Sequence, residues 1–440
     1  MTALPPDYRE RRGDSVLLVW GDLPWWTVVD RDADRFIAGL VEGESPAQAL
    51  DRLPHRPGIE RDAAAIVQAL KRAGVIGRKR NKPPKTRIES ISVNVTNRCN
   101  LNCTFCYNRD HEDHGDGLSA DEMIEALESV RRLVVRDAPL AMLGGEPLMA
   151  PERTLALAEW ARRRGMTPLL STNGTLVTAD FARRAAEIGI DCQVSIDGAS
   201  AESHDAVRGE GTFERAVGGV ETFRDAGAHT IISMVFHAGN VGEIPGYLRM
   251  ARELRVDEAR FIPVKALAGG GDFRLPELGE VVNTIADIVS AKPELGSLLG
   301  RDYVSILAQT CRSCALRQGC GTASQTLLLD ADGTVYPCIN LSQPEMALGN
   351  VREQSLRRVW QGDGRIREIR EAVTLESRDT CLECWARHWC MGGCRGETYS
   401  NTGKLDAPSM TCAQNRAAIV ETFWAISRCP ELVHEGPKYC

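Results

Sequence analysis

Three closely spaced cysteines constrain this chain more than any other sequence feature. They are Cys99, Cys103 and Cys106, separated by three and then two residues, and Phe105 directly precedes the last one. The β-branched run 91–96 comes just before them and predicts a strand that ends in a cysteine-bearing loop. Three thiolates from one loop leave one iron of a four-iron cube without a protein ligand, so that iron can bind an outside molecule.

This loop resembles the signature of the radical S-adenosylmethionine (radical SAM) enzymes. The resemblance implies that the free iron chelates the amino and carboxylate groups of S-adenosylmethionine. It also implies that an electron from the cluster cleaves this cofactor to a 5′-deoxyadenosyl radical. The alternative is a zinc knuckle or an inert group of thiols. Zinc sites favour four ligands in paired units, and neither a His nor a fourth Cys follows within this loop.

The region from 91 to 265 alternates predicted strands with predicted helices. Strands are expected at 91–96, 138–143, 167–171, 191–195, 229–236 and 259–264. Helices are expected at 121–136, 153–164, 179–188, 213–226 and 244–254, with a capping box at Ser119 and Glu122 and an N-cap at Thr178. Six alternating units predict an α/β fold with parallel strands. This pattern resembles the partial (β/α)6 barrel of radical SAM enzymes.

Further motifs follow the predicted strands, where barrel folds collect their functional residues. The 144–147 motif, Gly-Gly-Glu-Pro, resembles the family motif that holds the amino group of the cofactor. The 171–174 and 195–198 motifs resemble positions that line its ribose and carboxylate, and Arg208 resembles an arginine that pairs with the carboxylate, a task that suits a guanidinium fork. The cofactor-binding residues that the resemblance implies are Tyr107, Gly144, Gly145, Glu146, Pro147, Ser171, Asn173, Ser195, Asp197 and Arg208.

The last third of the chain carries a second group of spaced cysteines. Their order resembles the SPASM domain, whose thiols hold two further [4Fe–4S] clusters with interleaved ligands. The resemblance implies a first set of Cys314, Cys320, Cys338 and Cys394, and a second set of Cys381, Cys384, Cys390 and Cys412. Four thiolates close a cube completely, which suits electron transfer rather than substrate chelation. A zinc site built from Cys311 and Cys314 with Cys381 and Cys384 is the alternative.

Two details qualify this resemblance. Cys192, Cys311, Cys429 and Cys440 remain unassigned, and Cys311 competes with Cys314 as a ligand. Anaerobic sulfatase maturases place an Asp that acts as a base directly after the cysteine corresponding to Cys338. In this chain that position is Ile339, so oxidation of Ser or Cys to formylglycine is the less favoured activity.

The first 77 residues predict a small winged-helix-like unit. Two β-like runs within 15–30 precede three helical patterns at 33–41, 46–53 and 60–74. The pattern resembles the PqqD-like domain that recognises the leader of a precursor peptide, which adds to the domain's sheet as an extra strand. A plain helical extension and a DNA-binding winged helix are the alternatives, and the chain lacks the strong basic patch that DNA binding needs.

Composition supports a metal or redox protein of the cytoplasm. The chain has 440 residues, a net charge of −7 and 15 cysteines. It shows no apolar run long enough for a membrane span, no signal-peptide core and no charge excess that favours nucleic acid. Cysteines without an export signal indicate metal binding rather than disulfides. The predicted divisions are 1–77 (leader recognition), 78–90 (basic linker), 91–265 (barrel), 266–308 (connection) and 309–440 (SPASM).

These features predict a radical SAM/SPASM peptide maturase. The expected activity is hydrogen abstraction from a ribosomally made precursor peptide followed by crosslink formation, with a thioether favoured and a carbon–carbon bond next. The expected cofactors are S-adenosylmethionine and three [4Fe–4S] clusters, and the electron donor is a flavodoxin or ferredoxin. Maturation of a protein subunit or of a peptide-derived redox cofactor is the second enzymatic interpretation. A zinc-stabilised peptide-binding scaffold is the non-enzymatic one.

Overall fold

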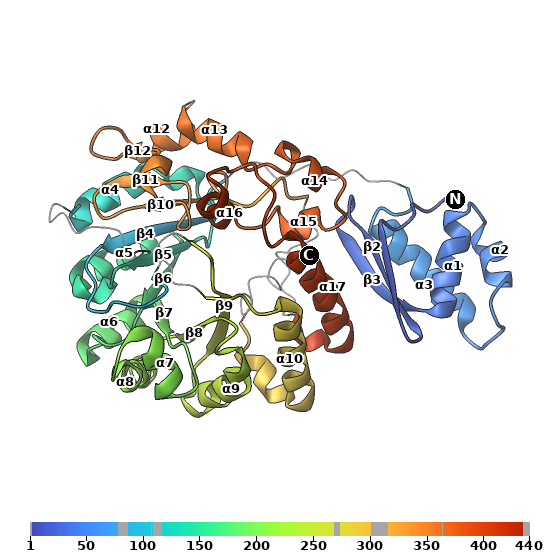
Figure 1. Ribbon diagram of the computed structural model, residues 1–440, viewed down its shortest axis with the longest axis horizontal. Helices are drawn as coiled ribbons and strands as arrows, with labels where there is room; N and C mark the ends of the chain where they lie inside the picture. The colour runs from blue at the N-terminus through green and yellow to red at the C-terminus, as the bar shows by residue number, and fades with distance from the viewer. Residues whose placement is uncertain are drawn as a thin grey trace.

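The computed structural model describes residues 2–77, 87–106, 108, 117–267, 273–300, 316–362 and 364–433. Two sheets organise this part of the chain. The larger sheet has nine strands in the order β12-β11-β10-β4-β5-β6-β7-β8-β9, and the smaller has three in the order β1-β2-β3 (Figure 1). Within the described residues, no helix is long and apolar enough to cross a membrane.

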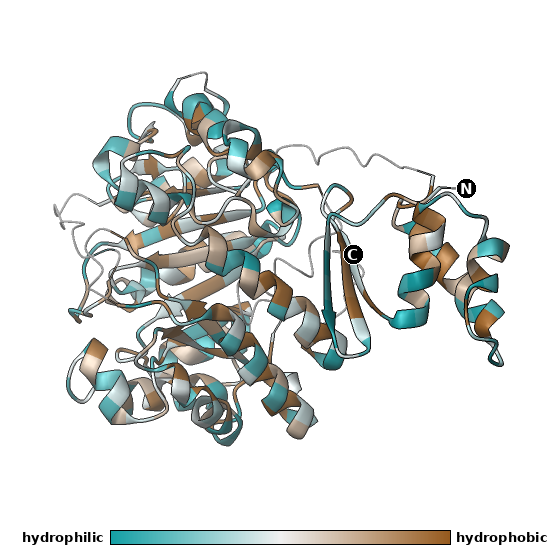
Figure 2. Ribbon diagram, turned by 45° about the vertical axis from the view of Figure 1, so that its right-hand side comes forward, coloured by the Kyte–Doolittle hydropathy of each residue, from teal (hydrophilic) through white to brown (hydrophobic). Residues whose placement is uncertain are grey.

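The barrel strands predicted from the sequence are confirmed. They are β4 (Ser90–Thr96), β5 (Pro139–Gly144), β6 (Thr167–Thr172), β7 (Asp191–Ser195), β8 (Thr230–Phe236) and β9 (Glu258–Pro263). Each pairs with the next in parallel. Parallel strands covered on both faces read as nearly continuous apolar runs, and Figure 2 shows apolar residues concentrated in this sheet. All six strands therefore bring their C-terminal ends to one edge.

The outer helices also follow the prediction, with shifted ends. They are α4 (Ala120–Val130), α5 (Pro151–Arg163), α6 (Ala179–Ile188), α8 (Thr212–Asp225) and α9 (Ile244–Glu253), and Figure 1 shows them around the outside of the curved sheet. The capping box is present: the Ser119 hydroxyl accepts from the Glu122 amide, and the Glu122 carboxylate accepts from the Ser119 amide. The Thr178 hydroxyl accepts from the Phe181 amide and so caps α6. The first helix is shorter than expected because a 3-10 turn, η1 (Arg131–Leu133), replaces its end.

Four elements of the barrel region and its edge were not predicted. A short helix, α7 (Ala201–Arg208), follows β7. Beyond β4, the sheet continues with β10 (Thr326–Leu329), β11 (Thr334–Tyr336) and β12 (Gly349–Asn350). β10 pairs with β4 in parallel, whereas β11 and β12 pair in antiparallel fashion. The C-terminal cysteine region is therefore hydrogen-bonded directly to the strand that carries the first cysteine loop.

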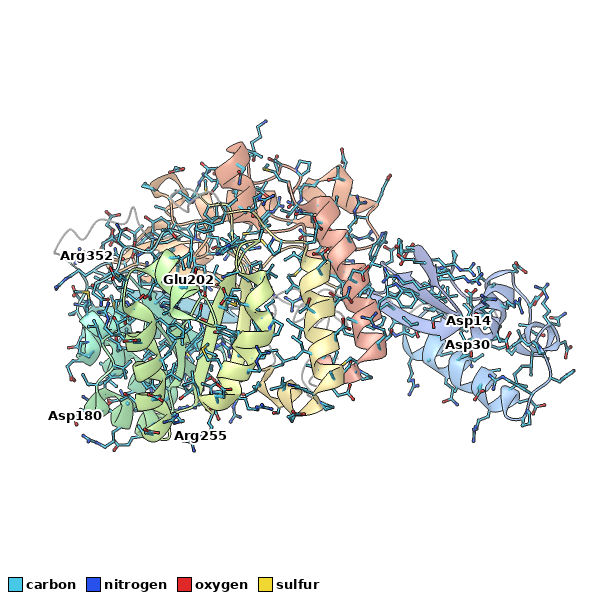
Figure 3. The ribbon with its side chains drawn as sticks, turned by 60° about the horizontal axis from the view of Figure 1, so that its bottom comes forward. Asp14, Asp30, Asp180, Glu202, Arg255 and Arg352 are labelled. Atoms are coloured by element: carbon cyan, nitrogen blue, oxygen red, sulfur yellow. The ribbon has the colours of Figure 1, made fainter. Side chains whose placement is uncertain are left out.

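The remaining helices complete the C-terminal part. They are α10 (Leu278–Ala291), α12 (Leu356–Gln361), α13 (Arg365–Ala372), α14 (Asp379–Leu382), α15 (Arg387–Cys390), α16 (Arg395–Thr402) and α17 (Cys412–Arg428). Short 3-10 turns lie between the elements: η2 (Pro147–Met149), η3 (Val241–Glu243), η4 (Pro293–Leu298), η5 (Pro344–Met346), η6 (Leu375–Ser377) and η7 (Pro430–Leu432). Charged side chains such as Asp180 and Arg255 lie at the periphery, as Figure 3 shows.

The N-terminal unit, residues 2–77, has its own sheet and its own core. Its strands are β1 (Tyr8–Arg12), β2 (Ser15–Trp20) and β3 (Trp25–Asp30), and its helices are α1 (Arg31–Val41), α2 (Pro46–Asp51) and α3 (Ile59–Arg72). The sequence did not predict β1, because four of its five residues are charged. β2 is buried on both faces: Val16, Leu18 and Trp20 join the core of this unit, whereas Leu17 and Val19 join the core of the main body. One face of this small sheet is thus docked on the rest of the chain.

Candidate functional site

The first cysteine loop leaves the C-terminal end of β4 and lies against the loop that follows β5. The Gly145 amide donates to the Thr96 carbonyl at 2.8 Å, and the Glu146 amide donates to the Arg98 carbonyl at 2.7 Å. A Cβ atom on Gly145 would lie 2.1 Å from the Arg98 carbonyl oxygen, so no side chain fits there. Gly144 has φ +136°, which also favours glycine. The glycine pair therefore lets two strand-end loops approach each other closely.

Glu146 organises this edge from inside the protein. Its side chain is buried and accepts hydrogen bonds from the Thr172 hydroxyl at 2.6 Å, the Asn173 amide at 2.8 Å and the Leu148 amide at 2.9 Å. Burial raises the pKa of Glu146, and the three hydrogen bonds oppose that rise. Because a carboxylate has about four acceptor positions, most of its capacity is used by the protein. Glu146 thus joins the loop after β5 to the end of β6.

Amide side chains extend this connection to the cysteine loop. The Asn173 side chain donates to the Asn100 side-chain oxygen at 2.9 Å, and the Asn100 side chain donates to the Thr175 hydroxyl at 2.9 Å. Asn100 lies directly after Cys99. The sequence analysis did not single out Asn100, and its position inside the cysteine motif was the available signal. The loop is therefore held by side chains as well as by its own backbone.

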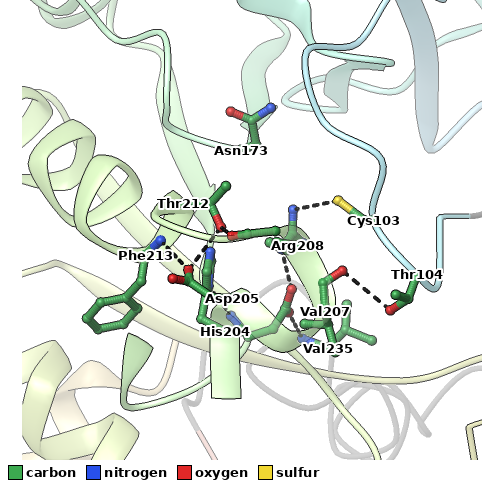
Figure 4. A network of polar contacts seen from close by, with 12 residues as sticks. Cys103, Thr104, Asn173, His204, Asp205, Val207, Arg208, Thr212, Phe213 and Val235 are labelled. Atoms are coloured by element: carbon green, nitrogen blue, oxygen red, sulfur yellow. Dashed lines mark hydrogen bonds and ion pairs between the residues drawn. The ribbon is translucent and has the colours of Figure 1, made fainter. Parts of the chain in front are cut away.

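Arg208 is the charged group that approaches the cysteine loop. It ends α7, forms a buried ion pair with Asp197 and places Nη1 4.0 Å from Sγ of Cys103 (Figure 4). Its guanidinium also lies 5.7 Å from the centre of the Phe105 ring. Burial disfavours the charge, yet the Asp197 carboxylate keeps the pKa of Arg208 above its usual range. The Thr104 amide donates to the Val207 carbonyl at 2.9 Å, which joins the same loop to α7.

Asp197 is held in place by two residues that sequence reasoning missed. His204 Nδ1 accepts from the Asp197 amide at 3.1 Å, and the Asn240 side chain donates to the Asp197 carbonyl at 3.0 Å. The Asp197 carboxylate in turn accepts from the Val235 amide at 2.7 Å. His204 lies four residues before Arg208, which the sequence did single out, whereas nothing near Asn240 indicated a role. Together these contacts join the ends of β7 and β8 to the Arg208 ion pair.

The remaining predicted cofactor residues lie along the same strand ends. Ser171 stands beside Gln193 in the register of β6 and β7, and Ser195 stands beside Ser233 in that of β7 and β8. Pro147 begins a 3-10 turn and is buried. Tyr107 lies outside the described residues. The structure therefore brings the described members to one edge, and their contact with a cofactor stays a prediction.

The thiols of the first loop lie in surroundings that suit the binding of an iron–sulfur cluster. Burial raises the pKa of Cys99 and of Cys103, and charge on the neighbouring cysteines adds to the rise. Arg208 lowers both values. A metal cluster removes the proton from each thiol and neutralises the resulting charge. The donor set, three thiols and one buried cation on a single edge, therefore fits an iron–sulfur cluster.

The C-terminal cysteines fall into two neighbourhoods. Cys338 follows β11 and interacts electrostatically with Cys394 and Cys320, and burial raises the pKa of Cys338 to about 12. Cys390 interacts in the same way with Cys412, Cys384 and Cys381, and burial raises the pKa of Cys390 to about 11. These groups have the composition of the two predicted sets, apart from Cys314. Cys314 and its competitor Cys311 lie outside the described residues.

Polar groups near these sulfurs were not predicted. Asn340 donates to the Cys394 sulfur at 3.5 Å, Arg378 to the Cys381 sulfur at 3.5 Å and Asn415 to the Cys390 sulfur at 3.8 Å. Hydrogen bonds to ligand sulfurs raise or lower cluster potentials. Arg395 is buried and interacts electrostatically with cysteines of both neighbourhoods. This region therefore holds hydrogen-bond donors of the kind that shift the reduction potential of iron–sulfur clusters.

No group of three or more His, Cys, Asp and Glu side chains is arranged to hold a metal ion in the part of the chain that the structure describes. A four-iron cube places its thiolates on separate irons, so they stand farther apart than the ligands of a single ion. The fit of these cysteines to iron–sulfur clusters therefore rests on the chemistry of the thiols and of the groups around them.

Comparison with known proteins agrees with this arrangement. A model of the radical SAM superfamily matches residues 93–251, and a model of the SPASM iron–sulfur cluster-binding domain matches residues 320–385. The chain is 30% identical over 337 residues to mycofactocin maturase MftC of Mycobacterium ulcerans, covering 74% of this chain and 88% of the relative. It is 29% identical over 334 residues to the AdoMet-dependent heme synthase of Methanosarcina barkeri, covering 71% and 93%.

A solved structure extends the likeness to nearly the whole chain. The crystal structure of Streptococcus suis SuiB bound to precursor peptide SuiA aligns with a TM-score of 0.59 and 16% identity, covering 92% of this chain and 100% of that chain. The fold and the strand-end site thus define an enzyme with a radical SAM barrel and a C-terminal SPASM domain. The chain belongs to the radical SAM superfamily.

Proposed function

We propose that this enzyme modifies a ribosomally made precursor peptide by abstracting hydrogen from a peptide Cα or Cβ and forming a crosslink. A thioether to a cysteine is the first expectation for the new bond, and a carbon–carbon bond is the second. The observation that carries the proposal is one chain with a radical SAM cysteine loop, a SPASM domain and a docked N-terminal sheet. The SuiB structure, aligned over 92% of this chain, was solved with its own precursor peptide bound, which supports this proposal.

Each residue at the strand-end site has a proposed task. Cys99, Cys103 and Cys106 would hold a [4Fe–4S] cluster that, with bound S-adenosylmethionine, supplies a carbon-centred radical. Backbone carbonyls of the 144–147 loop would accept hydrogen bonds from the amino group of the cofactor, as the resemblance of this motif implies. Arg208 would attract the cofactor carboxylate with the guanidinium nitrogens that Asp197 does not occupy.

The C-terminal cysteines have a proposed task in electron transfer. The first set, Cys314, Cys320, Cys338 and Cys394, and the second set, Cys381, Cys384, Cys390 and Cys412, would each hold one [4Fe–4S] cluster. Crosslink formation leaves a surplus electron, which these clusters would carry to an acceptor. A flavodoxin or ferredoxin would deliver the electron that starts the reaction. Free thiols persist in reducing compartments, which supports the cytoplasm as the location.

The N-terminal unit would bind the leader of the precursor as an added strand. Its sheet has two edges, β1 and β3. β1 carries Arg9, which pairs with Asp34, and Arg12, which pairs with Glu421. Charged edge strands resist pairing with another chain. β3 carries the apolar and β-branched run 25–29 and is the edge that we assign to the leader.

Maturation of a peptide-derived redox cofactor is the second candidate. The relative named mycofactocin maturase MftC favours it, since 74% of this chain aligns with that protein. The two candidates share the cysteine loop and the barrel. They differ in the product, because a redox cofactor is cut from the peptide whereas a crosslinked peptide keeps its length.

The deciding experiment uses a synthetic peptide encoded by a short reading frame beside the gene. Anaerobically reconstituted enzyme, S-adenosylmethionine, dithionite and this peptide are incubated, and the products are analysed by mass spectrometry. Loss of two hydrogens from the peptide supports crosslinking, whereas loss of a fragment supports the second candidate. Formation of 5′-deoxyadenosine without any peptide change would contradict a peptide substrate.

A further inference from the structure

We propose that the N-terminal unit and the second cysteine set stabilise each other. Binding of a cluster by Cys381, Cys384, Cys390 and Cys412 would fix the surface on which the unit docks, and docking would protect that cluster from loss. The proposal rests on the assignment of these four cysteines to one cluster in the proposed function.

The second cysteine set lies on two separate segments of the chain. Three of its members lie within 381–390, and the fourth, Cys412, is the first residue of α17. The protein already joins these segments at two points. Trp389 meets Phe423 edge to face with ring centres 5.3 Å apart, and the Asn415 side chain donates to the Cys390 sulfur at 3.8 Å. A cluster held by all four thiols would add a covalent bridge between the same segments.

The N-terminal unit contacts the first of these segments through its sheet. Tyr8 of β1 stacks on Trp385, with ring centres 4.5 Å apart and 26° between the planes. Trp385 lies directly after Cys384. Asp22, in the turn between β2 and β3, forms an ion pair with Arg387. A Cβ atom on Gly21 would lie 2.5 Å from the Trp385 carbonyl oxygen, so backbone meets backbone at this point.

The same sheet contacts α17, which carries the fourth cysteine. Trp26 of β3 stacks on Phe423, with ring centres 4.4 Å apart. Arg12 donates to both oxygens of Glu421, at 3.0 and 2.5 Å, and lies 5.0 Å from the Trp424 ring centre. Figure 1 shows α17 between β3 and the main body. The N-terminal unit therefore spans the two segments that the cluster would bridge.

Cluster binding and docking of the N-terminal unit are thermodynamically linked, because both need the same two segments to be ordered. Holding 381–390 against α17 orders both the ligands of a cluster and the docking surface. Whichever event occurs first pays the ordering entropy, so the second becomes more favourable. Linkage is reciprocal: if the cluster favours docking, docking favours the cluster by the same factor.

The first arm of the test follows docking after loss of a cluster ligand. Hydrogen exchange of residues 8–30 is measured by mass spectrometry in reconstituted Cys384→Ser, with Cys338→Ser of the first set as the matched control. We expect exchange in 8–30 to become about tenfold faster in Cys384→Ser, within the usual range of coupling between linked sites. We expect Cys338→Ser to resemble wild type there. Equal acceleration in both variants, or none in Cys384→Ser, would overturn the proposal.

The second arm follows the cluster after docking is weakened. Gly21→Ala combined with Arg12→Gln disturbs the interface. Arg9→Gln is the control, because Arg9 lies on the same strand but pairs with Asp34 of its own unit. Both are placed in full-length enzyme lacking the Cys99, Cys103 and Cys106 thiols, and iron release to a chelator is timed. We expect one of two release phases to quicken about tenfold only in the interface variant. Unchanged phases would contradict the linkage.

Iron content separates failure of this inference from failure of the assignment beneath it. If the thiol-deficient background binds about eight irons but its release phases ignore the interface variant, the clusters stand and the linkage is wrong. If that background binds about four irons or fewer, the two-cluster assignment itself is wrong.

Discussion

Arg208 and Asp197 form an ion pair between the end of α7 and the loop after β7, and both side chains are almost completely buried. The pair holds a positive charge 4.0 Å from the Cys103 sulfur. A buried guanidinium needs a partner, because an unpaired charge in the interior is strongly destabilising. Asp197 therefore compensates the permanent charge of Arg208 beside the cysteine loop.

Replacing Asp197 with Asn is expected to lower the free energy of unfolding by about 3 to 5 kcal/mol, because it leaves a buried charge unpaired. Denaturant unfolding of the iron-free chain measures this loss. Arg252→Gln is the control, since Arg252 pairs with Glu294 at an exposed position, where ion pairs contribute little. Equal losses in the free energy of unfolding would show that the buried pair stabilises the fold no more than the exposed pair does.

The first cysteine loop is expected to be required for cofactor cleavage. Cys99, Cys103 and Cys106 are changed together to Ala, and 5′-deoxyadenosine is measured after anaerobic reconstitution with iron, sulfide and dithionite. We expect no product, because no thiolate remains to hold the cluster. Cys192→Ala is the matched control: Cys192 is buried in β7 and burial raises the pKa of its thiol, so we expect wild-type cleavage. Product at the wild-type rate in the triple variant would contradict the assignment.

The barrel could be predicted because its signal is local. Each strand is a short apolar run, and α4 and α6 each begin at a capping residue, so neighbouring residues suffice. The missed helix α7 has only eight residues, of which only His204 and Val207 are buried, so it shows little apolar periodicity. The extension of the sheet by β10 was missed because its partner is far away in sequence: Thr326 pairs with Ser90. Register between such segments depends on tertiary packing.

The candidate site shows the same division. Cysteine spacing and glycine pairs identify residues that need little context. The three donors to Glu146 and the contact between Arg208 and Cys103 arise only when separate strand ends meet. β2 illustrates the point for the N-terminal unit. Its uninterrupted apolar run 16–20 indicated a strand, and only docking explains why both of its faces are apolar.

Iron content is expected to distinguish the two candidate ligands that lie outside the described residues. Wild type should bind about twelve irons if it holds three four-iron cubes. We expect Cys314→Ala to lose about four irons and Cys311→Ala to lose none, with Mössbauer spectra identifying the cluster type. Loss of a cluster only in Cys311→Ala would reverse the choice of ligand. About four irons in well-reconstituted wild type would remove the auxiliary clusters altogether.

Deletion of residues 2–77 is expected to abolish peptide modification while leaving uncoupled cleavage of S-adenosylmethionine. The barrel carries the cofactor residues, whereas the N-terminal unit carries the edge strand assigned to the leader. Because deletion also uncovers Phe423 and Trp385, the interface variant Gly21→Ala with Arg12→Gln is the control that keeps the unit present. Unchanged modification of the full-length precursor by the truncated enzyme would argue against leader recognition.

Stability is expected to fall in acid through His204. Its ring is buried, Nδ1 accepts from the Asp197 amide, and Nε2 has no hydrogen-bond partner among the described contacts. Burial lowers the pKa of His204 from 6.5 to about 4. The unfolded chain therefore takes up a proton that the folded chain refuses, so the stability contributed by His204 is lost as the pH falls from about 6.5 toward about 4.

The size of this effect can be measured by substitution. Between pH 7 and pH 5, His204 should reduce the free energy of unfolding by about 2 kcal/mol. His204→Gln removes the titration and should be less stable than wild type at pH 7, but its stability should change less over this range. Denaturant midpoints of the iron-free proteins at both pH values give the comparison. His237→Gln is the control. His237 is only partly buried, and burial lowers its pKa by a smaller amount than that of His204, so this substitution should change the pH dependence less. An identical pH dependence in wild type and His204→Gln would show that His204 takes up its proton equally in the folded and unfolded chain.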